Sequence, residues 1–133
     1  MYGTILKMKL SPQGVKNMSD YYGEIYPEED EEGGRQLPQG ALCAIDFQLD
    51  DEPDTFIHIA IFESREAYWA NAESPEQNER FEKAVAMLQP AGEPEWNDGA
   101  VVNVIRARGV DLNERLAQDE TAPVTLVDET ERV

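Results

Sequence analysis

The alternation of apolar and polar positions predicts a strand at the start of the chain, followed by a helix. Tyr2–Leu10 repeats with a period of two, as a half-buried strand does, and one face collects Tyr2, Thr4, Leu6, Met8 and Leu10. Ser11-Pro12 predicts a helix start, because the hydroxyl can cap free amides and proline is tolerated at the first helical position. The helix carries an apolar stripe and is weakened by two glycines, Gly14 and Gly23, the second of which could end it.

Two further strands form a predicted hairpin. Ala41–Leu49 and Asp54–Phe62 are rich in apolar residues and are separated by the turn Asp50-Asp51-Glu52-Pro53. The second of these strands opens the stretch Asp54–Gln89, which is the most regular part of the chain.

The remainder of that stretch predicts a helix in two parts. Ser64 caps the first part, which runs to about Ala72. Ser74 and Gln77 have the spacing of a capping box, in which each side chain satisfies the other's backbone amide, and they restart the helix. The second part has a core-facing stripe made of Phe81, Ala84, Val85 and Leu88.

The remaining segments complete the predicted domain. Ala100–Arg108 is the fourth strand, Asp111–Gln118 has a helical pattern, and Val124–Val127 resembles a strand. Tyr26–Gly40 is rich in acids and glycine, a composition typical of an exposed loop. We therefore expect one domain over residues 1–109 with an acidic loop insertion at 26–40, and an acidic C-terminal extension at 110–133.

The order β-α-β-β-α-β predicts an α+β, ferredoxin-like fold with an antiparallel sheet and both helices on one face. The open face of such a sheet should be polar at every second residue. Here Ile57, Ile59 and Ile61 lie opposite Phe56 and Phe62, so both faces are apolar. We therefore expect a homodimer that packs sheet against sheet as a dimeric α/β barrel.

Composition excludes several classes of partner. The chain has 28 Asp and Glu against 11 Lys and Arg, a formal charge of −17, which argues against binding to nucleic acid or to an anionic membrane. Cys43 is the single cysteine, so no disulfide forms within the chain. No apolar run approaches the roughly 20 residues that span a bilayer. A cytoplasmic protein is the expectation.

Two segments resemble a known family. Phe62-Glu63-Ser64-Arg65-Glu66-Ala67, followed by Ser74-Pro75 before an amphipathic helix, is similar to the antibiotic biosynthesis monooxygenase branch of the dimeric α/β-barrel superfamily. The similarity covers roughly residues 1–109. The superfamily includes cofactor-free oxygenases of quinol-like aromatics, haem-degrading enzymes, isomerases and members of unknown role, so the resemblance implies a fold more firmly than a reaction.

The chain departs from this family where the chemistry is expected. Quinol-oxygenase-like members commonly have a histidine on the helix before Ser-Pro and another just after it, where this chain has Asn71 and Glu76. Haem-degrading members place their iron-ligating histidine near Glu79–Phe81, where this chain has none. The resemblance therefore implies chemistry without a cofactor and argues against haem held by this helix.

Four residues are candidates for contact with a small aromatic ligand. His58, the single histidine, is either a general base or a hydrogen-bonded histidine that lines the sheet. Tyr68 and Trp69 point about 100° apart on a helix, so one of them faces the core, where it either binds a flat phenolic substrate or simply packs. Asn103 lies on the face of Val101 and Ile105 in the fourth strand, where it bonds across the barrel or faces a pocket.

The other polar residues within strands, Asp46, Gln48, Arg106 and Arg108, favour interface or edge roles. Asp46 and Arg106 could pair at the dimer interface.

Three hypotheses about function remain open. The first is a cofactor-independent oxygenase or isomerase of a small aromatic or quinol-type substrate. The second is a non-catalytic barrel dimer that binds a small ligand or a partner protein. The third takes the acidic loop as a docking segment for a basic partner.

Overall fold

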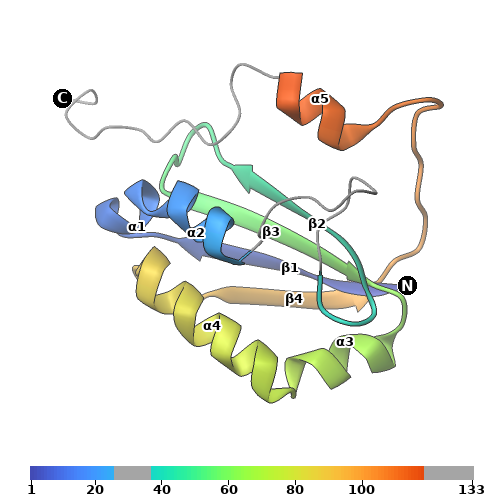
Figure 1. The fold of residues 1–133 in the computed structure, drawn as a ribbon, viewed down its shortest axis with the longest axis horizontal. Coiled ribbons are helices and arrows are strands. Elements are labelled where there is room, and N and C mark those ends of the chain that lie inside the picture. The colour runs from blue at the N-terminus through green and yellow to red at the C-terminus, as the bar shows by residue number, and fades with distance from the viewer. Residues whose placement is uncertain (26–36, 119–133) are drawn as a thin grey trace.

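The structure is a computed structural model, and it describes residues 1–25 and 37–118 (Figure 1). The elements are, in order, β1 (Tyr2–Lys9), α1 (Pro12–Lys16), α2 (Met18–Ile25), β2 (Ala41–Gln48), β3 (Thr55–Phe62), α3 (Arg65–Ala72), α4 (Pro75–Leu88), β4 (Glu95–Ala100) and α5 (Leu112–Gln118). The four strands form one sheet in the order β2-β3-β1-β4, and every neighbouring pair is antiparallel. This confirms the predicted α+β, ferredoxin-like fold.

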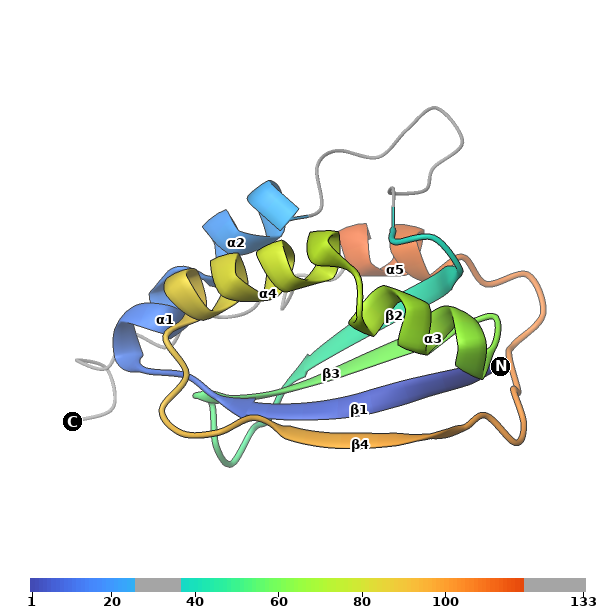
Figure 2. The ribbon, with the colours of Figure 1, turned by 90° about the horizontal axis from the view of Figure 1, so that it is seen from below.

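The molecule has two layers. Figure 2 shows α1, α2, α3 and α4 over one face of the sheet, while no helix of the described chain covers the opposite face. Residues on β1 reflect this arrangement, because Thr4, Leu6 and Met8 are buried beneath the helices while Ile5 is exposed. The predicted division of this strand into an inner and an outer face is therefore confirmed.

Serine caps define the starts of three helices, as predicted. The Oγ atoms of Ser11, Ser64 and Ser74 accept hydrogen bonds from backbone amides three residues ahead, at 3.0 to 3.1 Å. The capping box at Ser74 is one-sided, however, because the backbone amide of Ser74 donates to the carbonyl of Asn71 and not to the side chain of Gln77. Asn71 and Gln77 both lie at the junction between α3 and α4.

The first predicted helix is divided into α1 and α2, with Asn17 between them. The division lets Asn17 donate from Nδ2 to the carbonyl of Met87, at 2.7 Å, near the end of α4. Gly14 has a packing role at the same point, because a Cβ atom there would collide with the carbonyl of Leu88. Gly23 does not end the helix, which continues to Ile25.

The hydrophobic core joins β1 and β3 to α1, α2 and the last turns of α4. It consists of Leu6, Met8, Leu10, Val15, Met18, Phe56, Ala84 and Leu88. Of the stripe predicted on α4, Ala84 and Leu88 are buried, but Val85 is 39% exposed. The buried stripe on α4 is therefore narrower than predicted.

The fourth strand was predicted at Ala100–Arg108, and that prediction is wrong. β4 spans Glu95–Ala100, and the chain after it has no regular structure until α5. The reason is the position of β1. The bridge between Leu10 and Pro90 brings the chain beside the end of β1, and the pairing runs from Lys7 with Glu95 to Tyr2 with Ala100.

The apolar segment 101–105 therefore lies beyond the start of its partner strand. Its first residue still donates a backbone hydrogen bond to the carbonyl of Met1, at 3.0 Å. Val102 and Ile105 are then 95% and 89% exposed.

Two predicted features lie wholly or partly outside the described residues: the acidic loop, of which 37–40 alone are described, and the strand-like segment Val124–Val127. The predicted helix at Asp111–Gln118 corresponds to α5. Among the helices that the structure describes, none is long and apolar enough to cross a membrane.

Candidate functional site

A cleft of about 820 Å³ lies between the helices and the inner face of the sheet. Its floor includes Thr4, Leu6, Phe56 and Ala60 from the central strands, and α2, α3 and α4 supply the other walls. Most of the lining is apolar or aromatic, and a few polar side chains converge on it. This combination is typical of a small-molecule site.

The first polar group of the cleft is a pair on the β2–β3 hairpin. Asp46 and His58 are directly opposite in the register, and the Oδ1 atom of Asp46 lies 2.6 Å from Nδ1 of His58. The two side chains are 27% and 29% exposed, and both line the cleft. A carboxylate is purely an acceptor, so Nδ1 carries the proton in this contact and Nε2 keeps its lone pair when the ring is neutral.

The second polar group is the hydroxyl of Tyr68, a residue of α3 that lines the cleft. Its ring is buried and packs against Tyr2, Phe62 and Trp69, with centroids 5.1 to 5.5 Å apart. The hydroxyl donates to Oδ1 of Asp98 on β4, at 2.7 Å. Burial, followed by this hydrogen bond, raises the pKa of Tyr68 to about 12, so the phenol stays protonated at neutral pH.

The third polar group spans the junction of α3 and α4. Arg80 donates from Nε to Oε1 of Gln77, at 3.2 Å, and from Nη2 to Oδ1 of Asn71, at 3.0 Å. Asn71 in turn donates from Nδ2 to Gln77, at 3.3 Å. All three residues are half-buried and line the cleft. The two amides therefore hold the guanidinium in place.

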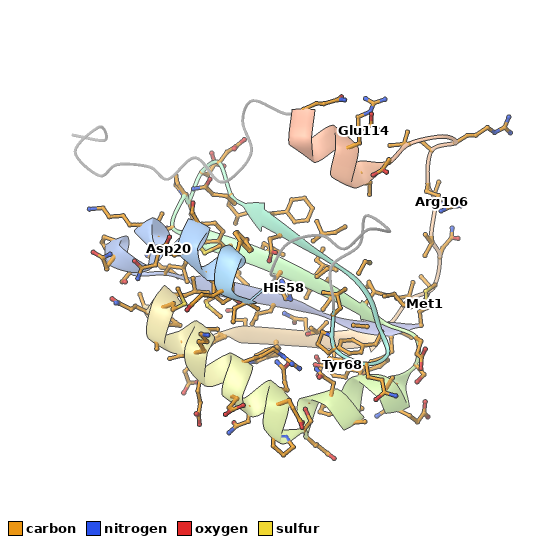
Figure 3. All side chains as sticks on the ribbon, viewed as in Figure 1. Met1, Asp20, His58, Tyr68, Arg106 and Glu114 are labelled. Carbon is orange, nitrogen blue, oxygen red and sulfur yellow. The ribbon has the colours of Figure 1, made fainter. Side chains whose placement is uncertain are left out.

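The structure brings two of the four predicted site residues to the cleft. His58 lies over the middle of the sheet, and Tyr68 lies at α3, the helix to which it belongs (Figure 3). Both residues belong to the lining of the cleft. Trp69 is 40% exposed and lies outside the lining, consistent with the expectation that one of the two helix aromatics faces inward. Asn103 lies in the exposed segment after β4 and likewise does not line the cleft.

Asp46 and Arg80 are among the contributing residues that the sequence patterns did not place at the site. Asp46 was given an interface or edge role, in which it could pair with Arg106 across a dimer; within the chain it contacts His58, and Arg106 lies in the exposed segment after β4. Counting residues outward from the hairpin turn could have suggested the Asp46–His58 pair. No sequence pattern indicated that Arg80 lines the cleft, because a single arginine on an amphipathic helix usually lies on the solvated face.

Metal ligands are not gathered at the cleft. Within residues 1–25 and 37–118, no three His, Cys, Asp or Glu side chains lie together as a set that could hold a metal ion.

Comparisons with known proteins identify the fold. No family model matches the sequence, and no curated protein matches it. Among solved structures, a candidate antibiotic biosynthesis monooxygenase from Deinococcus radiodurans has 13% identity and a TM-score of 0.58, covering 82% of this chain and 100% of that one.

Two further solved structures are similar. A mutant of SnoaB, a cofactor-independent oxygenase from Streptomyces nogalater, has 8% identity and a TM-score of 0.55, covering 80% of this chain and 97% of that one. A protein of unknown function from Nitrosomonas europaea has 12% identity and a TM-score of 0.57, covering 81% and 95%. The chain therefore has the fold of antibiotic biosynthesis monooxygenase structures, as the segments around Ser64 and Ser74 predicted.

Proposed function

We propose that this protein is a cofactor-independent oxygenase of a small hydroxyarene, a substrate class that includes quinols. The observation that carries the proposal is the contact of 2.6 Å between Asp46 and His58 in the wall of a largely apolar cleft. A histidine oriented by a carboxylate is suited to take a proton from a phenol. Similar folds include a cofactor-independent oxygenase, which supports this choice of reaction class.

In the proposed reaction, His58 takes the hydroxyl proton of the substrate through Nε2. The arenolate transfers one electron to O₂, which gives an aryloxyl radical and superoxide. These combine at a ring carbon that bears hydrogen, and the peroxide formed takes up the proton from His58. Loss of the ring proton and cleavage of the O–O bond then give a quinone and water. Overall, one hydroxyarene and one O₂ give one quinone and one water.

The surrounding groups suit the binding of a planar ring. Phe56, Phe81 and Trp96 line the same cleft, and the rings of Phe81 and Trp96 are in contact with centroids 5.9 Å apart. Such rings bury aromatic surface and exclude water, which favours transfer of an electron from a desolvated arenolate.

The test measures oxygen uptake with a panel of naphthols, anthrols and quinols. We expect His58→Ala to lower the rate by about 100-fold or more, as loss of a general base does. His58→Gln is the matched variant, because its amide can still donate to Asp46 but cannot act as a base; it should fold normally and be equally slow. Unchanged oxygen uptake in both variants would remove His58 from the reaction.

We also propose that the protein forms a homodimer through the outer face of the sheet. That face presents Ile5, Ile45 and Phe47 at 42% to 49% exposure, beside the half-buried isoleucines of β3. No helix of the described chain covers it (Figure 2). An apolar surface of this kind is typical of a contact with a second copy. The expected result of sedimentation analysis is twice the mass of the chain.

A second candidate function is the non-catalytic binding of a small ligand. It is favoured by the mostly apolar lining of the cleft, which requires no reaction to account for it. Native mass spectrometry of protein purified from its own host separates the two functions. A bound small molecule that remains unchanged in the presence of O₂ would favour binding alone.

A further inference from the structure

Arg80 has no role in the proton transfer proposed above. It is the only Lys or Arg among the described residues that line the cleft. Its two hydrogen bonds, to Asn71 and Gln77, both go to neutral amide oxygens. A guanidinium has five N–H donors, so three of them have no acceptor within the described part of the protein.

The charge balance of the protein makes this arrangement unusual. The chain carries 28 acidic residues, yet none of the ion pairs in the described regions includes Arg80. Among the described lining residues the only carboxylate belongs to Asp46, and that carboxylate is held by His58. Removing a charge from water is costly unless the charge is paired, so a half-buried cation with no carboxylate partner in an apolar cleft points to an anion as ligand.

The geometry also limits which anion fits. Asn71 and Gln77 occupy Nε and one hydrogen of Nη2, which leaves the Nη1 edge and the second Nη2 hydrogen. Two parallel N–H groups match the two oxygens of a carboxylate, which arginine binds in a bidentate manner. The rest of the lining is largely apolar or aromatic, so the body of the ligand should be a hydrophobic ring.

We infer that Arg80 is a specificity residue, and that the cleft takes an aromatic carboxylate whose carboxyl group binds the guanidinium. This inference rests on the proposed function only in placing the ligand in the same cleft. The carboxylate would be anchored on α4, while the ring extends toward His58 on β3. Arg80 would act on binding rather than on the reaction.

The test compares 2-naphthoic acid with 2-naphthamide by isothermal titration calorimetry. The two compounds have the same ring and nearly the same shape, and neither can be oxidised by the proposed reaction. We expect the wild-type protein to bind the acid about tenfold more tightly or better, as a charge-assisted hydrogen bond implies. Arg80→Gln should abolish this preference while the affinity for the amide changes little.

Two further variants test whether a loss of folding, or the change in net charge alone, could explain a lost preference for the acid. Asn71→Asp places a carboxylate beside the guanidinium, where the present contact is 3.0 Å, and should reduce the preference for the acid without removing Arg80. Arg65→Gln makes the same change of net charge on the exposed surface of α3, outside the cleft lining, and should leave the preference intact.

The outcomes separate this inference from the proposed function. Equal binding of the acid and the amide by the wild-type protein, or a preference that survives in Arg80→Gln, would overturn the role of Arg80 even if hydroxyarenes are oxidised. A preference that depends on Arg80 would support that role even if no hydroxyarene is oxidised.

Discussion

The two faces of the sheet are built from the same strands but differ in what they carry. On β1, Leu6 is 7% exposed beneath the helices, while its neighbour Ile5 is 48% exposed on the other side. On β3, the inner face holds His58 in contact with Asp46, whereas the outer face repeats isoleucine at alternate positions. Since successive residues of a strand point to opposite faces, each strand contributes to both surfaces.

Because of this difference, the two faces suit different roles: the inner face suits ligand binding and the outer face suits association. The inner face is covered by helices that stand away from part of the sheet, which leaves a cleft where polar groups are sheltered but reachable. The outer face presents the exposed apolar side chains of Ile5, Ile45 and Phe47 and suits close packing against another apolar surface. We therefore expect changes on the inner face to affect stability and chemistry, and changes on the outer face to affect association.

The largest expected effect contrasts Leu6→Ala with Ile5→Ala. Leu6 belongs to the buried core, so its truncation should cost about 2–5 kcal/mol of unfolding free energy. Ile5 is half exposed, and its truncation should cost less than about 1 kcal/mol when the chain is monomeric. Urea denaturation at low protein concentration measures both. Equal losses would mean that the outer face is covered within a single chain.

The next effect concerns association through the outer face. Ile5→Asp places a carboxylate beside Ile59, its partner in the register, and burial of this charge at an interface should weaken dimerisation by about 100-fold or more. Analytical ultracentrifugation measures the change, and Ile5→Val is the conservative control that should remain dimeric. If Ile5→Asp dimerises as well as wild type, the contact uses another surface.

A smaller effect is expected on the inner face from Asp46→Asn. The amide oxygen can accept a hydrogen bond from Nδ1 but carries no charge, so the contact with His58 is weaker and the ring is oriented less firmly. We expect about a 10- to 100-fold slower oxygen uptake, as for other residues that support a reacting side chain. Asp98→Asn, which alters the partner of Tyr68, is the matched change and should leave the rate nearly unaffected. The reverse order of effects would exchange the roles of His58 and Tyr68.

The smallest expected effect concerns Tyr68 and pH. Its pKa in the folded protein, about 12, is higher than the ordinary value of 10.0. Folding therefore favours the protonated phenol; this contribution to stability is complete below pH 10 and is lost as the pH rises through 12.

Tyr68→Phe removes that dependence and costs about 1 kcal/mol at neutral pH through loss of the hydrogen bond to Asp98. Chemical denaturation at pH 7, 10 and 11.5 measures both effects. A wild-type protein whose stability falls no faster than that of the variant above pH 10 would contradict the raised pKa.

Local patterns were sufficient to predict much of the fold. The period-two alternation of β1 and the serine caps at Ser11, Ser64 and Ser74 depend on residues close in sequence, and the structure agrees with each of them. The fourth strand was placed too late because Val101–Ile105 looks more like a strand than Glu95–Ala100 does. Strand formation requires a partner, and β1 offers its backbone to residues 95–100.

The candidate site depended on longer-range geometry. His58 was recognised because it is the single histidine, but its partner is set by the register of the hairpin. A slip of one residue would place Ile45 opposite His58 and send Asp46 to the other face, so the pair cannot be read from composition. The bond from Leu49 to the carbonyl of Thr55 closes the turn and determines this register.

The sequence by itself determined the first three strands, the serine-capped helix starts, the apolar character of both sheet faces and the resemblance to a fold, because these follow from short-range periodicity and capping. Only the tertiary structure decided which strand segment completes the sheet, that Asp46 meets His58, and that Arg80 enters a cleft without an acidic partner in the described residues. The physical reason is that pairing and burial depend on residues brought together by the register of the sheet and the angle of the helices upon it.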